Sequence, residues 1–129
     1  MLENFIKQAE KDLNLENEIN SPEAGIFKIS FNEEIVVDAL LNLRGNYFFK
    51  GTIGECPKEK VEDFLLKIME ANLFGKGTYG AVIGLNDEEK ILTLSLEVDY
   101  NSTYKEWKEK LQDFSTVLNF WKNESQNHH

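Results

Sequence analysis

The sequence has few cysteine, histidine and proline residues, and the first two shortages exclude whole classes of site. Cys56 is the only cysteine among 129 residues, so an internal disulfide and a cysteine cluster for zinc are both excluded. The only histidines, His128 and His129, are the last two residues, which are either natural or the remnant of a purification tag. Without a histidine in the body of the chain, Cys56 has no partner for nucleophilic catalysis of the cysteine–histidine kind.

Positive charge is also scarce, because 14 Lys and Arg stand against 23 Asp and Glu and give a formal charge of −9. This balance argues against binding to nucleic acid or to an anionic membrane surface. No apolar run approaches the roughly 18 residues of a membrane helix, and the first residues lack the pattern of a secretory signal. We therefore expect no nucleic-acid partner, no membrane insertion and a cytoplasmic location.

The chain has enough apolar residues for one folded unit, since 41% of its residues are hydrophobic and its length is that of a single domain. We expect one domain over residues 1–122. Residues 123–129 are polar, and we expect them to form a frayed tail.

The spacing of apolar residues predicts three helices. The first covers residues 1–14, with its apolar stripe at Leu2, Phe5, Ile6, Ala9 and Leu13. The second has Pro57 in its first turn and continues to Asn72, with apolar residues at Val61, Phe64, Leu65, Ile68 and Met69. The third opens with Thr103 and Glu106 in a capping-box pattern and carries an aromatic stripe that is expected in the core.

Alternating and β-branched segments predict five strands, over residues 27–31, 35–41, 47–53, 81–85 and 91–98. Turn-forming residues separate them, including Asn20 to Pro22 before the first strand and Arg44 to Asn46 before the third. The expected fold class is therefore α+β, in the order α-β-β-β-α-β-β-α. A five-stranded antiparallel sheet would be packed by three helices.

The segment from Gly75 to Gly80 matches the pattern G-x-G-x-x-G, but its context excludes dinucleotide binding. That fingerprint requires a strand before it and a helix after it, whereas here a helix precedes and a strand follows. Gly75 is better interpreted as the C-cap of the second helix. The sequence contains no other catalytic, metal-binding or phosphate-binding pattern, so no catalytic residue, metal or cofactor is predicted.

Apolar residues are more abundant than a five-stranded sheet with one covering layer needs. The first helix, the strand over residues 35–41, the run Tyr47-Phe48-Phe49 and the wide second helix all present apolar faces. Large exposed apolar patches mark contacts between proteins. We therefore expect part of this surplus to lie at interfaces.

The segment from Glu70 to Leu85 resembles the class I chaperones of bacterial type III secretion, the Tir-chaperone (CesT-like) family. In that family a helix ends in an Ala-Asn-Leu-like segment, and a glycine-rich turn and an Ala-Val-Leu-Gly-like strand follow; here these are Ala71-Asn72-Leu73, Gly77-Thr78-Tyr79-Gly80 and Ala81-Val82-Ile83-Gly84. The small size, the acidic balance and the order of elements are also similar. The resemblance covers most of residues 1–122.

The resemblance implies a dimeric protein of the bacterial cytoplasm that is not an enzyme. Such a chaperone binds the N-terminal segment of a secreted effector, keeps it secretion-competent and delivers it to the secretion apparatus, where the secretion ATPase or sorting components are further partners. The dimer is either a homodimer or a heterodimer with a second chaperone. On this reading we expect effector contacts at Phe5, Ile6, Phe27, Ile29, Phe31 and Phe49 and dimer contacts at Phe64, Ile68, Val82 and Leu94.

Two other interpretations remain open at this point. One is a small α+β adaptor of the YbjN-like kind, with the same topology and no secretion cargo. The other is a small-molecule binder with a pocket between sheet and helices, which requires polar groups on the inward positions. The predicted inward stripes are almost entirely apolar, which disfavours the second.

Overall fold

A computed structural model describes residues 2–13, 19–23, 25–56, 61–74, 80–86 and 90–127. Its helices are α1 (Leu2–Asp12), α2 (Val61–Phe74) and α3 (Tyr104–Asn127). Its strands are β1 (Ile19–Glu23), β2 (Ile26–Ser30), β3 (Val36–Leu41), β4 (Tyr47–Glu55), β5 (Val82–Asn86) and β6 (Ile91–Val98). The α+β fold class, the three helices and the five predicted strands are confirmed, in the predicted order.

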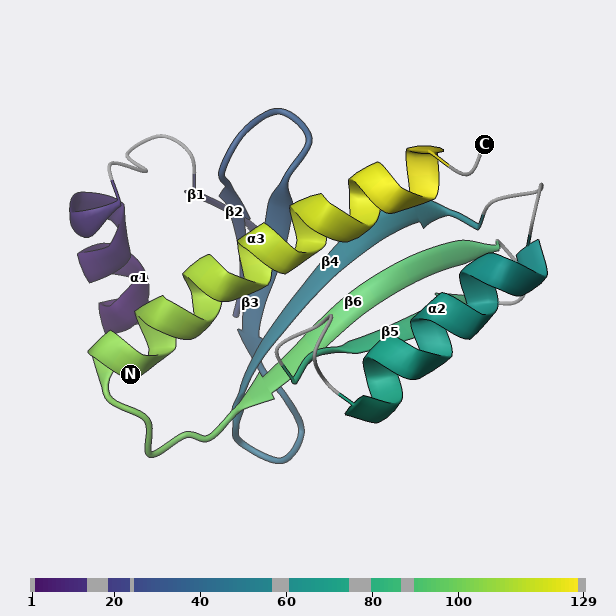
Figure 1. The fold of residues 1–129 in the computed structure, drawn as a ribbon. Helices are drawn as coiled ribbons and strands as arrows, with labels where there is room; N and C mark the ends of the chain where they lie inside the picture. Colours follow the sequence, from purple (N-terminus) through teal and green to yellow (C-terminus); the bar gives the residue numbers. More distant parts are fainter. Residues whose placement is uncertain are drawn as a thin grey trace.

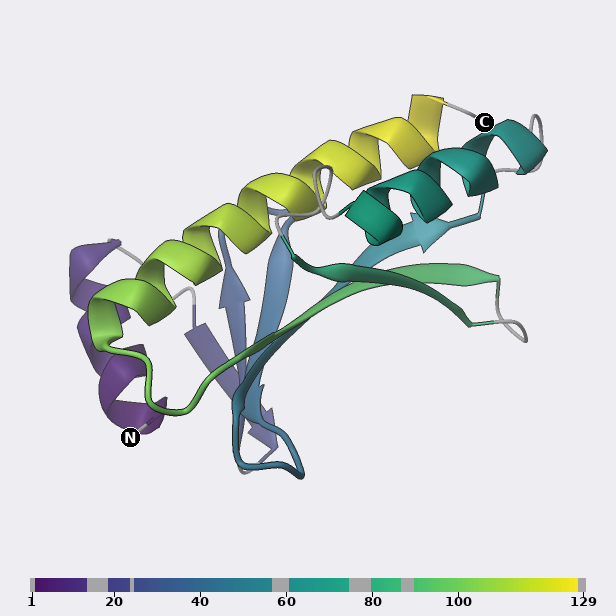
Figure 2. The ribbon, with the colours of Figure 1, turned by 60° about the horizontal axis from the view of Figure 1, so that its bottom comes forward.

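The strands form one twisted sheet in the order β1-β2-β3-β4-β6-β5, in which neighbouring strands are antiparallel. Helix α3 lies diagonally across one face of the sheet (Figure 1). Figure 2 shows α1 beside the first turns of α3 and α2 beside its last turns. The three helices therefore form one layer, in which α1 and α2 lie beside the two ends of α3.

In the part of the chain that the structure describes, the sheet has six strands, one more than predicted, and β1 is the strand that the sequence did not predict. Its residues Asn20 to Pro22 are turn formers, and their composition led to a turn at this place. The strand lies at the edge of the sheet, where proline is tolerated because one row of ladder hydrogen bonds is unused. Its register with β2 is irregular between Asn20 and Glu23, which also weakens a periodic signal.

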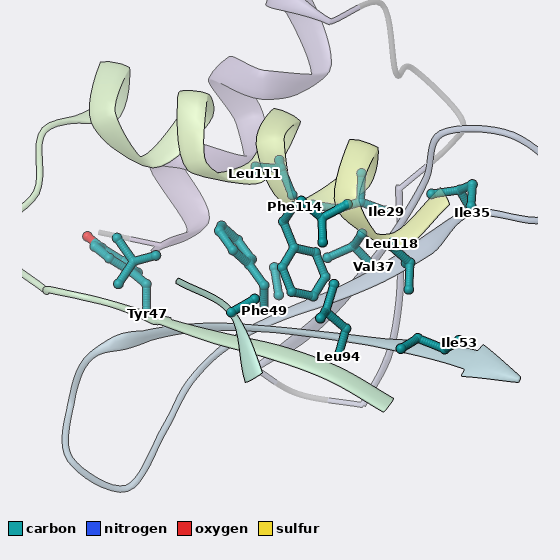
Figure 3. Close-up of a cluster of buried hydrophobic side chains, with 14 of the residues drawn as sticks. Ile29, Ile35, Val37, Tyr47, Phe49, Ile53, Leu94, Leu111, Phe114 and Leu118 are labelled. Carbon is teal, nitrogen blue, oxygen red and sulfur yellow. The ribbon is translucent and has the colours of Figure 1, made fainter. Parts of the chain in front are cut away.

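The core lies between α3 and the sheet. Figure 3 shows Leu111, Phe114 and Leu118 of α3 directed at Phe49 and Leu94 of the central strands. Gly51 of β4 allows this approach, because a β-carbon there would lie 2.5 Å from Leu118 Cδ2. The predicted aromatic stripe of the last helix is confirmed as core, with both tryptophans buried.

The first turn of α3 has the predicted capping box. The Glu106 amide donates to Thr103 Oγ1 at 3.2 Å, and the Thr103 amide donates to Glu106 Oε1 at 2.9 Å. The hydrogen bond from the Thr103 amide lowers the pKa of the Glu106 carboxyl below its ordinary value.

The end of α3 corrects the expectation of a frayed tail from residue 123. The helix continues to Asn127, and Ser125 within it is buried and donates from Oγ to the Glu55 carbonyl at 2.8 Å. Lys67 of α2 also forms an ion pair with Glu124 at 2.6 Å. Polar composition suggested a free end, but these side chains have partners on distant elements that only the tertiary structure brings close.

Some sequence predictions lie outside the described residues. They are the glycines at 75 and 77 and the first turn of the second helix around Pro57.

Candidate functional site

An apolar hollow of about 280 Å³ lies where the first turn of α1 meets the adjoining ends of β2 and β3. We call it the apolar hollow, and its lining consists of Leu2, Glu3, Gly25, Ile26, Phe27, Leu40 and Leu41. Leu41 is 43% exposed, whereas Phe27 is half-buried against the core. The hollow is therefore open to solvent, and most of the residues that line it are apolar.

The strands supply apolar side chains to both sides of the sheet at this end. Phe27 pairs with Ala39 and faces the core, so alternation places Ile26 and Leu40 on the opposite face. The sequence signal was the strand over residues 35–41, whose apolar residues do not alternate with polar ones. Glu3 is the one ionisable residue in the lining, so the hollow is suited to binding an apolar segment and has no acid–base pair.

The structure places most of the predicted effector contacts inside the protein. Phe27 lines the apolar hollow and Phe31 is half-buried beside the core. The other four are buried in the core, and two of them, Ile29 and Phe49, have no exposed surface. In this conformation an incoming segment cannot touch these four side chains, since they belong to the core beneath the surface.

An aromatic cluster fixes α1 against α3 and the sheet behind the hollow. The ring of Phe5 lies 5.2 Å from that of Tyr47 and 5.5 Å from those of Tyr104 and Trp107. The Tyr104 hydroxyl donates to Asp12 Oδ2 at 3.0 Å, and Lys108 Nζ lies 3.8 Å from the same oxygen. Burial, and then Asp12, raises the pKa of the Tyr104 hydroxyl. Helix α1 is thus held in place on the core.

Exposed apolar residues also lie on α2 and on the neighbouring edge strand β5. We call this part of the molecule the α2–β5 surface; its exposed apolar residues are Leu66, Met69, Val82 and Leu85. Of the predicted dimer contacts, Val82 lies on it and is 56% exposed. Phe64, Ile68 and Leu94 are buried in the core of the same chain. Leu66 and Met69, at 57% and 65% exposure, were missed because helical periodicity assigns an apolar residue to a stripe without showing what covers it.

Other site chemistry is absent from the part of the chain that the structure describes. Those residues contain no group of three or more His, Cys, Asp or Glu side chains placed to hold a metal ion. Among the described helices, none combines the length and apolar character needed to cross a membrane. Cys56 is half-buried, and its amide donates to the Lys90 carbonyl at 2.8 Å, which gives it a structural place beside β6.

Comparison with known proteins gives one family and several solved structures with the same fold. The model of the Tir chaperone protein (CesT) family matches residues 4–118. None of the curated proteins is a match by sequence.

Solved structures of type III secretion complexes share the fold. A chain of the heterodimeric complex ExoU–SpcU from the type III secretion system of Pseudomonas aeruginosa has a TM-score of 0.69 and 14% identity, covering 95% of this chain and 96% of that one. A chain of the HopA1–SchA chaperone–effector complex has a TM-score of 0.65 and 11% identity, over 92% and 94%. The Yersinia pestis type III secretion chaperone SycH, in complex with a fragment of YscM2, gives 0.65 and 16%, over 98% of each.

Proposed function

Because this chain belongs to the Tir chaperone protein (CesT) family, we propose that it is a type III secretion chaperone that binds the N-terminal segment of a secreted effector. It keeps that segment secretion-competent and delivers it to the secretion apparatus. The observation that carries this proposal is the family match over residues 4–118, since the match spans nearly all of the described fold. The fold shared with chains of chaperone–effector complexes supports it.

The apolar hollow is the place we propose for an effector side chain. It is open and apolar, it contains Phe27 of the predicted contacts, and it lies next to the turn that joins edge strand β1 to β2. An extended segment can insert apolar side chains into such a hollow while its backbone pairs with a sheet edge. The acidic balance of the chain favours an effector segment that carries positive charge.

The protein acts in the bacterial cytoplasm, as a chaperone and without catalysis of its own. The lining of the hollow, mostly apolar residues with Glu3 as its one ionisable residue, supports a binding role. The α2–β5 surface is where a second chaperone chain binds, either a copy of this one or a related partner. Its four apolar residues are exposed in the single chain, which is the condition that a dimer relieves.

The test is affinity purification from a lysate of the source bacterium with this chain as bait, followed by light scattering of the complex that is recovered. We expect a complex with two chaperone chains for one effector, held through the effector's N-terminal region. Leu41→Asp puts a charge at the rim of the apolar hollow and is expected to lower effector recovery roughly tenfold. Leu43→Asp is the matched control, because Leu43 is fully exposed on the neighbouring turn and does not line the hollow.

Equal loss of effector with both variants would move the binding surface elsewhere on the chain. A purified monomer that captures no secreted protein would contradict the chaperone function itself.

A further inference from the structure

Strands β3 and β4 diverge towards one end of the sheet (Figure 1). A second hollow, of about 320 Å³, is lined by residues of both strands there. The two strands pair only from Leu41 and Tyr47 to Asp38 and Lys50, and from Gly51 to Glu55 the register of β4 continues with β6. We call this site the lysine hollow, and its lining consists of Lys28, Glu34, Val36, Asp38, Lys50, Gly51, Thr52 and Lys122. Three strands and a flank of α3 therefore meet around it.

The lysine hollow has more basic than acidic residues in its lining, whereas the chain as a whole is acidic. Lys28 Nζ contacts Asp38 Oδ1 at 2.8 Å, so these two charges offset each other. Lys50 and Lys122 form no ion pair with any residue that the structure describes, and Glu34 is the one remaining acid in the lining. A chain with a formal charge of −9 thus concentrates two unpaired ammonium groups in one concave site.

The backbone at this site favours an extended occupant. After Lys50, no described strand pairs with β4 on the side of β3, so that edge of β4 lies beside the hollow. An extended segment can form backbone hydrogen bonds with such an edge while its side chains reach flanking groups. The lysines select for carboxylates among those side chains.

We propose that the lysine hollow binds an extended acidic segment, rich in Asp and Glu, of a protein partner. Carboxylates of that segment contact Lys50 and Lys122. This site lies towards the opposite ends of β2 and β3 from the apolar hollow, and the two linings have no residue in common. The inference goes beyond the proposed function, since it gives the chain a second partner of opposite charge that binds while the effector is held.

The test uses a fluorescent peptide of alternating Glu and Ser, with a Gln and Ser peptide as the neutral comparison. We expect the acidic peptide to bind in spite of the negative net charge, and to bind more weakly as salt screens the contact. In amide NMR spectra we expect its addition to shift Gly51 and Thr52. Lys50→Glu combined with Lys122→Glu is expected to lower its affinity roughly tenfold or more.

The matched control is Lys7→Glu combined with Lys105→Glu, which changes the net charge by the same amount at two exposed lysines outside both hollows. An equal loss of affinity in this control would overturn the proposal, because net charge alone would then explain binding. Absence of binding, amide shifts confined to other strands, or equal binding of the Gln peptide would overturn it as well. The proposal would also be overturned if inorganic phosphate shifted the amide signals of Gly51 and Thr52 and the acidic peptide did not.

Discussion

Helices α1 and α2 lie beside opposite ends of α3, yet their apolar residues have different surroundings. All four buried positions of α1, Leu2, Phe5, Ile6 and Ala9, form one stripe against the core. Helix α2 buries Phe64 and Ile68 in the same way but leaves Leu66 and Met69 exposed. Neighbouring residues on a helix lie about 100° apart, so α2 carries apolar side chains on more than one face. The comparison shows that α1 buries its apolar stripe within one chain, whereas α2 keeps apolar side chains exposed, and we propose that a second chain binds there.

The largest expected effect tests the packing of α1 on the core. Phe5→Ala removes a ring that contacts Tyr47, Tyr104 and Trp107, and we expect it to lower the free energy of unfolding by about 3–5 kcal/mol. Urea unfolding followed by circular dichroism measures the change. Leu43→Ala, at a fully exposed position, is the control and is expected to change it by less than about 0.5 kcal/mol. Similar losses in both variants would contradict the burial of α1.

The next effect tests the exposed apolar residues of α2. Leu66→Asp combined with Met69→Asp places two charges on the α2–β5 surface without touching the buried Phe64. We expect the dimer dissociation constant to rise roughly tenfold or more, which is about 1.4 kcal/mol. Sedimentation equilibrium measures it, and an unchanged far-ultraviolet spectrum checks that each chain stays folded. An unaltered dimer would place the interface on another surface.

A smaller effect compares the polar side-chain contacts that join α1 and α2 to α3. Asp12→Ala removes the acceptor of the Tyr104 hydroxyl and the partner of Lys108, and is expected to destabilise the fold by about 1 kcal/mol. Lys67→Ala breaks the exposed pair with Glu124 and is expected to cost about 0.2–1 kcal/mol. Chemical unfolding at low and high salt measures both, and a larger loss for Lys67→Ala would reverse the comparison.

The smallest effect concerns alkaline pH at the α1 end. Burial raises the pKa of both Tyr104 and Tyr47 above the ordinary value of about 10. Since the folded state holds these protons more tightly, their contribution to stability is present below pH 10 and is lost as the pH rises above it. We expect the free energy of unfolding to fall above pH 10 and the fall to be shallower in Tyr104→Phe. A steeper fall in that variant would contradict the assignment.

The sequence predicted the elements better than it predicted the contacts. The capping box at Thr103 and the tryptophan stripe were visible because both depend on residues within a few turns of each other. Strand β1 was missed since Pro22 and its neighbours are turn formers and the strand is defined by its pairing with β2. Ser125 was assigned to a frayed tail because its acceptor, the Glu55 carbonyl, lies 70 positions earlier in the chain.

For the candidate sites the difference is greater. Periodicity predicted apolar faces on the correct helices and strands, and the resemblance of residues 70–85 indicated the family that the match over residues 4–118 then showed. Which of those faces stay exposed depends on where α3 crosses the sheet, and Gly51 allows the close approach of Leu118 at that crossing.

The sequence by itself determined the helices, the five strong strands, the acidic charge and the absence of a catalytic pattern, because these follow from local spacing and composition. The tertiary structure alone decided that Ile29 and Phe49 are buried while Leu41 and Met69 are exposed. It also brought Lys122 of α3 and Lys50 of β4 into the lining of one hollow. The physical reason is that burial and charge clustering depend on packing between elements distant in sequence, which no local pattern encodes.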